Sequence, residues 1–510
     1  MHLLPELNRR LMLRFAAALT LAALSLTVFQ GQSQIDGIHE VRVIETAREM
    51  LELDDWIVPR FAGELRLEKP PLPYWISTLS YKLAGAPSVA AARFAVAGLG
   101  LLMLLSVWAI ARADGSARMA RLAVLILAGF LLFNSEFRKV TTDPFLAAWT
   151  SAAIAGFAWA HRLRGRRAAA CLALAYLFLS LALLAKGPIA LAFVAIGAFF
   201  VRPREGGHDW HWHGLGLLLA CLPLIAWALL VSERLPDAVS LWRHEVLGRV
   251  TGEVEEVRSR WFYFPALLAA AVPLLLPFFA ALLRGLRGRD RFALWLTSGL
   301  VFLMILSSRK AAYLLPLTAP ASLLTARYLD RIQAFREAAW LARIQFVVNL
   351  LLTAALLGAA LAWRDHLSWG AGAMAALLVL AAGTQIRQAS RGRLRVAALA
   401  AGGVMITTFY NGTLLAHLPE EHTLHNLGAY INEHVPRHAV LYQQGGNDPR
   451  LSFVINRLPA ALDDSLLCAT QTPAWLIRRG PLTQASACGW QEILATQSGK
   501  NRQFHLYRRN

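Results

Sequence analysis

The stretch from Ser88 to Arg112 reads SVAAARFAVAGLGLLMLLSVWAIAR and sets the class of fold expected for this chain. From Phe94 to Ala111 it carries no charged residue, and its length matches the ~20 residues that a helix needs to cross a bilayer. Similar runs recur along the 510 residues, of which 56% are hydrophobic and 16% charged. Soluble proteins carry roughly a quarter charged residues, so the sequence predicts an α-helical polytopic membrane protein.

The apolar runs predict about thirteen transmembrane helices. Their approximate bounds are Leu11 to Phe29, Ser88 to Arg112, Arg118 to Phe133, Pro144 to Ala160, Ala168 to Leu184, Pro188 to Val201, Gly214 to Ser232, Phe262 to Leu283, Phe292 to Ser307, Ala311 to Ala326, Ala342 to Trp363, Gly370 to Ala382 and Val396 to Leu415. The first run resembles a signal peptide, but no convincing small-residue cleavage site is evident, so we interpret it as an anchor.

The net charge of +19 comes largely from arginines in short loops. With the N-terminus in the cytoplasm, every even-numbered connection is cytoplasmic, and arginine clusters there satisfy the positive-inside rule. The clusters include Arg162, Arg164, Arg166, Arg167, Arg284, Arg287, Arg289, Arg291, Arg387, Arg391, Arg393 and Arg395. The loops 30–87, 134–143, 233–261 and 308–310 and the tail from about His417 are then outside. Because basic residues lie in loops rather than on one polar face, no nucleic-acid partner is expected.

The first outer loop predicts an amphipathic helix lying along the membrane surface, because Ile38, Val41, Ile44 and Leu51 recur at helical spacing. The remaining positions are rich in charge, including Glu40, Arg42, Glu45, Arg48 and Glu49. Two interpretations of these charges stay open. They form either a solvated face with helix-spaced ion pairs or the roof of a cavity beside the bilayer.

The composition changes near residue 417, which predicts a transmembrane domain over 1–416 and a small α/β domain over 417–510 outside the membrane. Strands are expected at Ala439 to Tyr442 and Phe504 to Tyr507, with a helix between them near Leu451 to Asn456. Cys468 and Cys488 lie in this tail, where oxidation is permitted, so we expect them to form a disulfide. Cys171 and Cys221 lie inside spans and should stay reduced.

Two short motifs on the outer side each allow a structural and a chemical interpretation. Asp143 precedes Pro144, which is typical of a helix N-cap, but its carboxylate could also orient a sugar hydroxyl or an acceptor amine. Lys186-Gly187-Pro188 indicates a tight break between two spans. All six lysines fall outside in this topology, where compact positive charges suit phosphate. They are Lys69, Lys82, Lys139, Lys186, Lys310 and Lys500.

Taken together, the outer-loop motifs resemble those of the bacterial membrane glycosyltransferases of the C-type fold. This family includes the aminoarabinose transferase that modifies lipid A and, more distantly, the protein O-mannosyltransferases. The matching residues, in order over about residues 30 to 330, are Glu40, Arg42, Glu45, Arg48, Glu49, Met50, Leu51, Asp55, Trp56, Val58, Pro59, Glu68, Lys69, Pro70, Pro71, Tyr74, Trp75, Arg93, Thr141, Thr142, Asp143, Lys186, Gly187, Pro188, Glu245, Arg249, Ser308, Arg309, Lys310, Tyr313 and Pro316.

The resemblance implies transfer of a sugar from a polyprenyl phosphate to a lipid or glycan acceptor on the outer face of the bacterial inner membrane. Catalytic roles are expected for Glu40, Asp143, Glu68, His39 and Asp36. Donor-phosphate binding is expected from Lys69, Lys186, Arg249, Arg309 and Lys310, and substrate binding from Arg42, Glu45, Tyr74, Glu245 and Tyr313. A carboxylate can act as general base at the acceptor, while cations stabilise the departing phosphate.

One departure from the family pattern concerns the start of the first loop, where this chain has His39-Glu40 in place of an Asp-Glu pair. Glu40, Asp36 or His39 must then serve as the first-loop catalytic acid, or the activity is altered. No cofactor is expected with certainty. The resemblance leaves a divalent metal near the first-loop glutamate open, and we assign no metal ligand in this chain.

Three other functions compete with lipid glycosylation. A flippase or transporter for lipid-phosphate sugars would place ionisable groups in the middle of its spans, whereas here they gather on one side. Transfer to protein would use the same donor chemistry. A structural partner of an envelope complex would account for the tail but not for the first-loop motif.

Overall fold

A computed structural model of the chain describes residues 3–31, 35, 37–202, 210–243, 259–306, 308–332, 336–391, 395–415, 422–444, 449–470, 473–482, 488–498 and 502–509. These residues divide into two compact units. Unit 1 comprises 1–33, 67–73 and 93–417, and unit 2 comprises 34–66, 74–92 and 418–510. The second break follows residue 417, near the expected domain boundary. The first outer loop, however, is divided between the units, with most of it in unit 2.

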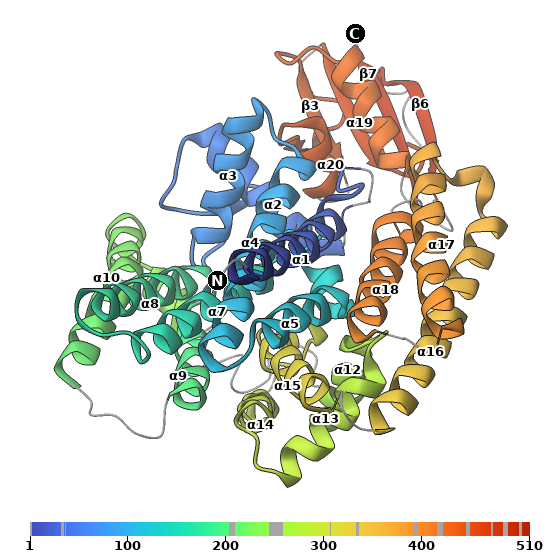
Figure 1. Cartoon of the computed structure of the whole chain (residues 1–510). Helices are drawn as coiled ribbons and strands as arrows, with labels where there is room; N and C mark the ends of the chain where they lie inside the picture. The colour runs from blue at the N-terminus through green and yellow to red at the C-terminus, as the bar shows by residue number, and fades with distance from the viewer. Residues whose placement is uncertain are drawn as a thin grey trace. The chain divides into compact units, whose positions relative to one another are not determined.

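Unit 1 is built almost entirely of helices (Figure 1). They are α1 (Leu3–Thr27), α4 (Val89–Asp114), α5 (Ala117–Gly129), α6 (Leu131–Glu136), α7 (Thr142–Ala160), α8 (Gly165–Lys186), α9 (Ile189–Val201), α10 (Trp210–Arg234), η1 (Arg260–Phe262), α12 (Tyr263–Ala270), α13 (Leu275–Arg287), α14 (Arg291–Ile305), η2 (Ala311–Leu317), α15 (Thr318–Arg331), α16 (Arg336–Ala362), η4 (Arg364–His366), α17 (Trp369–Ser390), α18 (Val396–Phe409) and η5 (Tyr410–Leu414).

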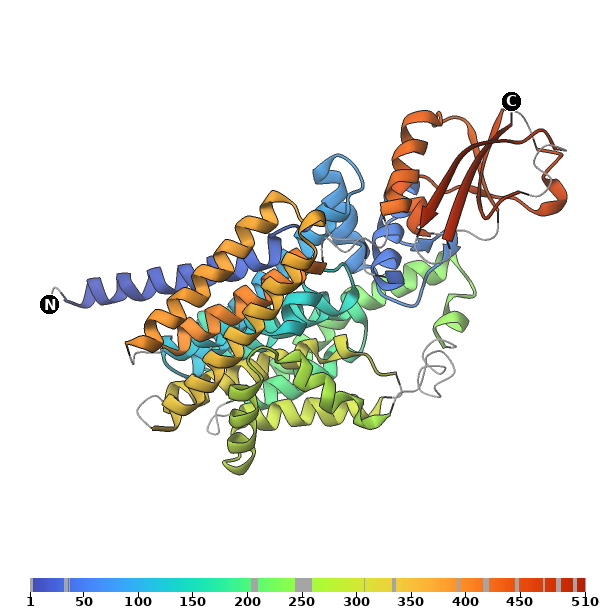
Figure 2. The ribbon, with the colours of Figure 1, turned by 90° about the vertical axis from the view of Figure 1, so that its right-hand side faces the viewer.

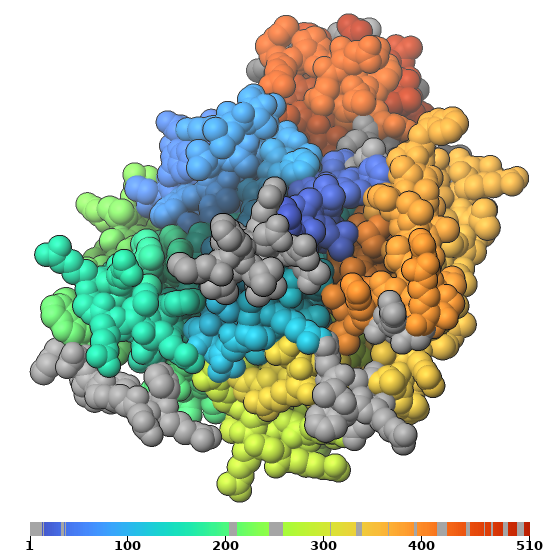
Figure 3. All heavy atoms as spheres, viewed as in Figure 1, coloured from blue at the N-terminus to red at the C-terminus, as the bar shows by residue number. Residues whose placement is uncertain are grey.

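Five helices of the described chain are long and apolar enough to cross a membrane: α4, α8, α10, α16 and α17. A multi-pass membrane protein is therefore confirmed, but the number of thirteen spans is not. Several outward side chains of α10, α16 and α17 are large and apolar, including Leu229, Leu351 and Leu380, as suits contact with lipid. Atoms of α16 and α17 (yellow to orange) form part of the surface in Figure 3.

Several expected spans are not continuous α-helices. The span over Phe262 to Leu283 is broken between α12 and α13, where Pro273 has no backbone N–H to continue the helix. The carbonyl of Val272 instead accepts a hydrogen bond of 2.9 Å from the N–H of Leu131. The span over Ala311 to Ala326 begins as the 3₁₀ helix η2 and continues as α15.

The end of α1 is held by two buried arginines from other parts of unit 1. Arg93 of α4 donates to the carbonyl of Gln30 at 3.0 Å, and Arg138 donates to the carbonyl of Ser25 at 2.9 Å and to that of Val28. The last carbonyls of a helix lack partners within it and carry partial negative charge, so guanidinium groups satisfy them well. Arg93 is one of the residues of the family motif, and its contact here is structural.

Unit 2 combines the helices of the first outer loop with a five-stranded sheet. Its elements are α2 (Gly37–Leu53), β1 (Arg60–Phe61), β2 (Glu64–Leu65), α3 (Leu72–Ala84, from Tyr74 on), α19 (His422–His434), β3 (Val440–Gln444), α20 (Pro449–Ile455), β4 (Ala460–Ala461), η7 (Asp464–Leu466), β5 (Ala474–Arg479), β6 (Gln491–Ser498) and β7 (Arg502–Arg509). The expected C-terminal α/β fold is confirmed.

The strand order of the sheet is β4-β3-β5-β7-β6. Strand β3 runs parallel to β4 and β5, with Leu441 opposite Trp475, whereas β7 runs antiparallel to β5 and β6. Figure 2 shows these strands side by side in the red part of the ribbon. One face of the sheet packs on α19 and α20 through Leu427, Ile431 and Phe504. The other face is covered by the segment that contains Trp490 and Cys488.

The structure joins Cys468 to Cys488 in a disulfide and leaves Cys171 and Cys221 as free thiols, as the sequence predicted. The disulfide closes a loop over a sequence separation of 20 on the α19-free face of the sheet. Closing a loop of this length lowers the conformational entropy of the unfolded chain, which stabilises the folded domain by about 3 kcal/mol.

We expect the paired variant Cys468→Ser/Cys488→Ser to unfold its C-terminal sheet about 3 kcal/mol more easily than the native protein. Hydrogen exchange of β5 to β7 in detergent measures this difference. The matched control, Cys171→Ser/Cys221→Ser, should leave the exchange unchanged. Free thiols at 468 and 488 in protein from the native envelope would contradict the prediction.

Candidate active site

An ion pair between two helix ends forms the centre of the candidate site in unit 1. Asp143 lies in the first turn of α7, and Lys186 is the last residue of α8. The Lys186 ammonium donates to Oδ1 of Asp143, and both side chains are about nine-tenths buried. The pair is therefore shielded from water. In such a buried environment the interaction between two charges is stronger than at an exposed surface.

Asp143 is not the N-cap that its position before Pro144 suggested. The cap residue is Thr141, whose side chain makes no capping hydrogen bond, and the helix already includes Thr142. Asp143 therefore points its carboxylate at Lys186 rather than at its own helix. It still benefits from the positive end of the α7 dipole, because it lies in the first turn.

Tyr313 completes the arrangement around Lys186. The Lys186 Nζ lies 4.2 Å from the centroid of the Tyr313 ring, which is cation–π geometry. The Tyr313 hydroxyl is 3.3 Å from the Ser308 Oγ. The ammonium is thus held from two sides, by a carboxylate and by an aromatic face. Such a fixed cation is suited to a developing negative charge because no reorganisation is needed.

The segment before η2 adds further positive charge to this region. Arg309 is buried and donates to the carbonyl of Met304 at 3.4 Å, and Lys310 directly precedes η2. Tyr263, fully buried at the start of α12, interacts electrostatically with Tyr313, Arg309 and Asp143. Tyr263 is a member of the site that our sequence analysis missed, because a tyrosine at the start of an apolar run looks like an interfacial anchor.

The strap 67–73, which carries Glu68 and Lys69, belongs to unit 1 and approaches the same helix end. Gly187 has φ +74°, and a Cβ placed there would lie 3.9 Å from Cγ of Pro70. The carbonyl of Leu67 accepts a hydrogen bond of 2.9 Å from the indole of Trp242. The break that Lys186-Gly187-Pro188 predicted after α8 is confirmed, and it lets the stiff proline strap pass close to Gly187.

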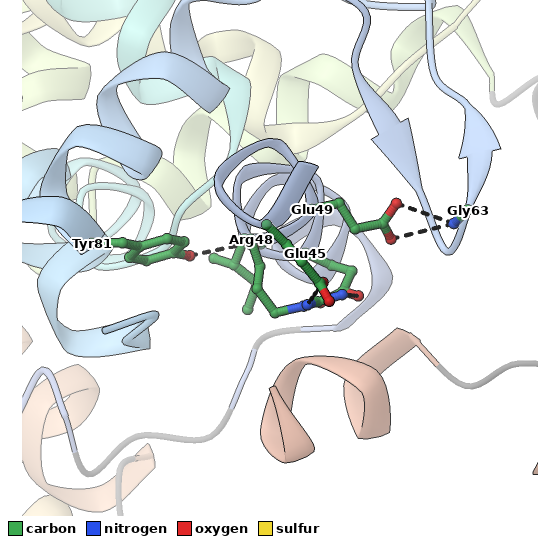
Figure 4. A network of polar contacts seen from close by, with 7 residues as sticks. Glu45, Arg48, Glu49, Gly63 and Tyr81 are labelled. Carbon is green, nitrogen blue, oxygen red and sulfur yellow. Dashed lines mark hydrogen bonds and ion pairs between the residues drawn. The ribbon is translucent and has the colours of Figure 1, made fainter. Parts of the chain in front are cut away.

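Unit 2 carries the other predicted residues, mainly on α2 (Figure 4). Glu40, Glu45, Arg48 and Glu49 are all buried, whereas His39 is exposed and Arg42 is half-buried. The interpretation of these charges as a solvated face is therefore wrong. Neighbouring segments cover the helix on the charged side as well as on the side of Val41 and Ile44.

Arg48 pairs with two carboxylates of α2, the buried Glu45 and the half-exposed Glu52. Its Nε and Nη2 donate to the two oxygens of Glu45, each at 2.8 Å, and its Nη1 donates to Glu52. On the neighbouring position, both oxygens of Glu49 accept from the N–H of Gly63 in the β1–β2 turn. The network ties the helix to the hairpin that follows it, as the dashed lines in Figure 4 show.

Helix α3 fixes α2 from another side. The hydroxyl of Thr78 donates to the carbonyl of Ala47 at 3.0 Å, and that of Tyr81 donates to the carbonyl of Ile44 at 3.2 Å. Tyr74, an expected substrate ligand, is fully buried and accepts a hydrogen bond from Arg66 at 3.2 Å.

Burial raises the pKa of the Glu45 carboxyl from 4.5 to about 7, in opposition to the hydrogen bonds and positive charge of Arg48. Burial also raises the pKa of Glu49, against the hydrogen bond from Gly63. For Arg48, burial lowers the pKa, but Glu45 and Glu52 more than reverse this effect, so its pKa is raised. Arg48 thus stays charged while Glu45 changes its charge near neutral pH.

The predicted residues thus form two groups, each within its own unit. Asp143, Lys186, Arg309, Lys310 and Tyr313 come together in unit 1 with the strap that carries Glu68 and Lys69, while Glu40, Arg42, Glu45 and Tyr74 belong to unit 2. Asp36, Glu245 and Arg249 lie outside the described residues. Among the residues with described positions, no group of three or more His, Cys, Asp or Glu side chains could hold a metal ion.

The raised pKa of Glu45 makes a prediction for stability against pH. Between pH 4.5 and 7 the folded protein keeps a proton on Glu45 that the unfolded chain releases, so stability should fall as pH rises through this window. Melting of the purified protein at pH 5 and pH 8 measures the change. Glu45→Gln should reduce the pH dependence, whereas Glu52→Gln, at a side chain 50% exposed, should retain it. Equal pH dependence in Glu45→Gln and the native protein would contradict the assignment.

The chain is similar in sequence to known membrane glycosyltransferases. Residues 10–203 match the family model for dolichyl-phosphate-mannose-protein mannosyltransferase. An undecaprenyl phosphate-alpha-4-amino-4-deoxy-L-arabinose arabinosyl transferase from Edwardsiella ictaluri (strain 93-146) is 30% identical over 328 residues, which cover 61% of this chain and 58% of the relative. The chain spans less than two thirds of the length of the curated relatives that it matches first.

Two solved structures share the fold over nearly the whole chain. ArnT from Cupriavidus metallidurans in the apo state has a TM-score of 0.78 and 19% identity, and the match covers 99% of this chain and 98% of that one. The structure of the same protein bound to undecaprenyl phosphate has a TM-score of 0.76 and 20% identity, with coverage of 98% and 97%. The chain therefore has the C-type fold of the membrane glycosyltransferases, and its resemblance to them is confirmed.

Proposed function

We propose that this protein is a glycosyltransferase that moves a sugar from a polyprenyl phosphate to a lipid of the lipid A type, on the outer face of the bacterial inner membrane. The observation that carries the proposal is the buried contact of Asp143, Lys186 and Tyr313 beside the strap of Glu68 and Lys69. The names of the relatives, arabinosyl transferases that use undecaprenyl phosphate, support the donor class.

In the proposed reaction, the bond between the sugar C1 and the phosphate oxygen breaks, and the electron pair leaves with the phosphate. A bond forms between C1 and a nucleophilic oxygen of the acceptor. If that oxygen is a hydroxyl, its proton passes to a carboxylate. Lys69, Lys186, Lys310, Arg309 and Arg249 bind the donor phosphate and stabilise the charge that develops on it.

The acceptor side of the reaction uses the carboxylates Glu40, Glu68 and Asp143. Glu40 takes the place of the first-loop acid, with His39 and Asp36 as the alternatives from the same motif. Tyr313, Tyr74, Arg42 and Glu245 shape the substrate site. Asp143 also orients Lys186, because its carboxylate accepts the hydrogen bond of the ammonium.

Transfer to protein is a second candidate, since the family model that matches residues 10–203 describes protein mannosyltransferases. The solved ArnT structure matches 99% of this chain, whereas the mannosyltransferase model matches residues 10–203, so we rank transfer to protein second. An assay that offers a lipid A-type lipid and a serine- or threonine-rich peptide in parallel separates the two acceptors.

Substitutions of the carboxylates and of the lysines should affect different kinetic quantities, the rate of transfer and the affinity for the donor. Glu40→Gln should bind the donor normally but lose transfer by ~10²- to 10⁴-fold, the usual cost of removing a general base, and Asp143→Asn should lose transfer to a similar extent. Lys69→Ala and Lys310→Ala should weaken donor binding itself. Donor affinity and transfer are measured on each purified variant after its melting temperature has been compared with that of the native protein.

The controls are an exposed carboxylate and a lysine away from the cluster. Glu64 is exposed at the β1–β2 turn, and the Lys82 ammonium lies over the Trp56 ring at 4.6 Å. Glu64→Gln and Lys82→Ala should retain transfer. Near-native transfer by both Glu40→Gln and Asp143→Asn would show that the carboxylate roles are wrong.

The proposed outer location of the first loop and of the C-terminal domain rests on the arginine-rich loops of the opposite side. Reporter fusions after Gly63 and after Asn510 should both read as exported, and a fusion after Arg166 should read as cytoplasmic. A cytoplasmic signal at either of the first two positions would overturn this topology.

A further inference from the structure

Helix α2 buries several charged side chains, although burial of charge is not needed for a helix to fold. Four of its charged side chains, those of Glu40, Glu45, Arg48 and Glu49, are at most 3% exposed. Burying an ion costs several kcal/mol even after relaxation, and the attraction to a partner returns this only when the geometry is good. The bidentate contact of Arg48 with Glu45, with both bonds at 2.8 Å, meets that condition.

The C-terminal domain supplies the cover over this pair. Helix α20 packs against α2 within unit 2. In Figure 4 the side chains of Glu45 and Arg48 leave α2 on the side on which α20, in salmon, lies. On α20 itself, Leu451 and Ser452 are fully buried, and the Phe453 ring lies 6.3 Å from the ring of Tyr81 on α3.

Stability alone does not account for such a pair. Replacing a buried ion pair with apolar side chains of similar volume is often neutral or stabilising, whereas removing one partner is strongly destabilising. A buried pair does impose something that apolar contacts do not, because its bidentate geometry allows few arrangements. The pair on α2 can therefore serve to define the conformation in which the helix packs under α20.

We propose that Arg48 is a positioning residue of the transfer reaction, which pairs with Glu45 so that α20 of the C-terminal domain can hold α2, and with it Glu40, in one fixed place. The proposal rests on the proposed function for the role of Glu40. In this arrangement the C-terminal domain contributes to catalysis without contacting the substrate. Glu45 is then a partner of Arg48 rather than a substrate ligand.

Glu40 is connected to this network through the helix and through Tyr81. It lies in the first turn of α2, and both Glu40 and Glu45 interact electrostatically with the Tyr81 hydroxyl, as does Arg48. A helix transmits a displacement along its length, so a shift of α2 under α20 moves Glu40. A misplacement of about 1 Å at a reacting group can reduce the rate ~10²-fold.

The test replaces the ion pair with apolar groups that keep its volume. Glu45→Leu/Arg48→Met should fold with a melting temperature near that of the native protein, while kcat falls by at least about tenfold and the KM values for donor and acceptor change little. Hydrogen exchange in residues 37–53 should become faster, with no change in β5 to β7. Arg48→Lys, which keeps the charge but not the bidentate fork, should be intermediate in both measurements.

A matched control is the exposed pair Arg364–Asp365, whose side chains are 79% and 86% exposed. Arg364→Met/Asp365→Leu removes a similar ion pair and should leave kcat and the exchange of α2 unchanged. If the double variant at 45 and 48 fails to fold, Arg48→Lys provides the same comparison.

Native kcat in the double variant would overturn the proposal, as would a loss of kcat without faster exchange in α2. A rise in acceptor KM with unchanged kcat and unchanged exchange would instead identify Glu45 as a substrate ligand, which also overturns it. If the native protein transfers no sugar, the proposed function fails. Exchange in α2 then still decides whether Arg48 positions the helix.

Discussion

The apolar interior of a bilayer offers no hydrogen-bond partner to a polar group, and this constraint governs where the charges of the chain lie. Within the helices of unit 1, most charged side chains lie near helix ends, where backbone groups also lack partners, while the buried amides of Gln345, Asn349 and Gln385 bond one another. Arg93 and Arg138 satisfy the last carbonyls of α1, and Asp143 and Lys186 meet where α7 begins and α8 ends. The helix bundle thus concentrates its charged groups near helix ends, which is where we propose that the donor phosphate binds.

The Asp143–Lys186 and Glu45–Arg48 ion pairs differ in what they connect. Asp143 and Lys186 come from different helices and share the face of Tyr313, so their contact defines a point between elements at which a phosphate can be held. Glu45 and Arg48 lie on the same helix and are covered by α20. Their bidentate contact pairs two buried charged groups within the helix itself. We infer that the first pair acts on the substrate, whereas the second acts on the position of the groups that do.

Several features followed from local sequence patterns alone. The α/β character of the C-terminal domain followed from the change of composition near residue 417 and from its strand-like segments, and β3, α20 and β7 lie close to their expected positions. The disulfide followed from the placement of two cysteines in the tail. The burial of Glu45 and Arg48 could not be predicted in this way. Helical spacing of charges describes a solvated face equally well until the segment that covers that face is known, and α20 lies some 400 residues further along the chain.

The sequence by itself determined that the chain crosses a membrane repeatedly and that acidic and basic groups occur together in its outer-loop motifs, because bilayer thickness and helical periodicity act over short stretches. Only the tertiary structure decided that Asp143 contacts Lys186 rather than capping α7, and that α2 is buried on its charged side. It also brought Tyr263 to the site and assigned most of the first loop to the same unit as the C-terminal domain. These outcomes depend on contacts between residues far apart in sequence, and side-chain burial is settled only when the covering element is in place.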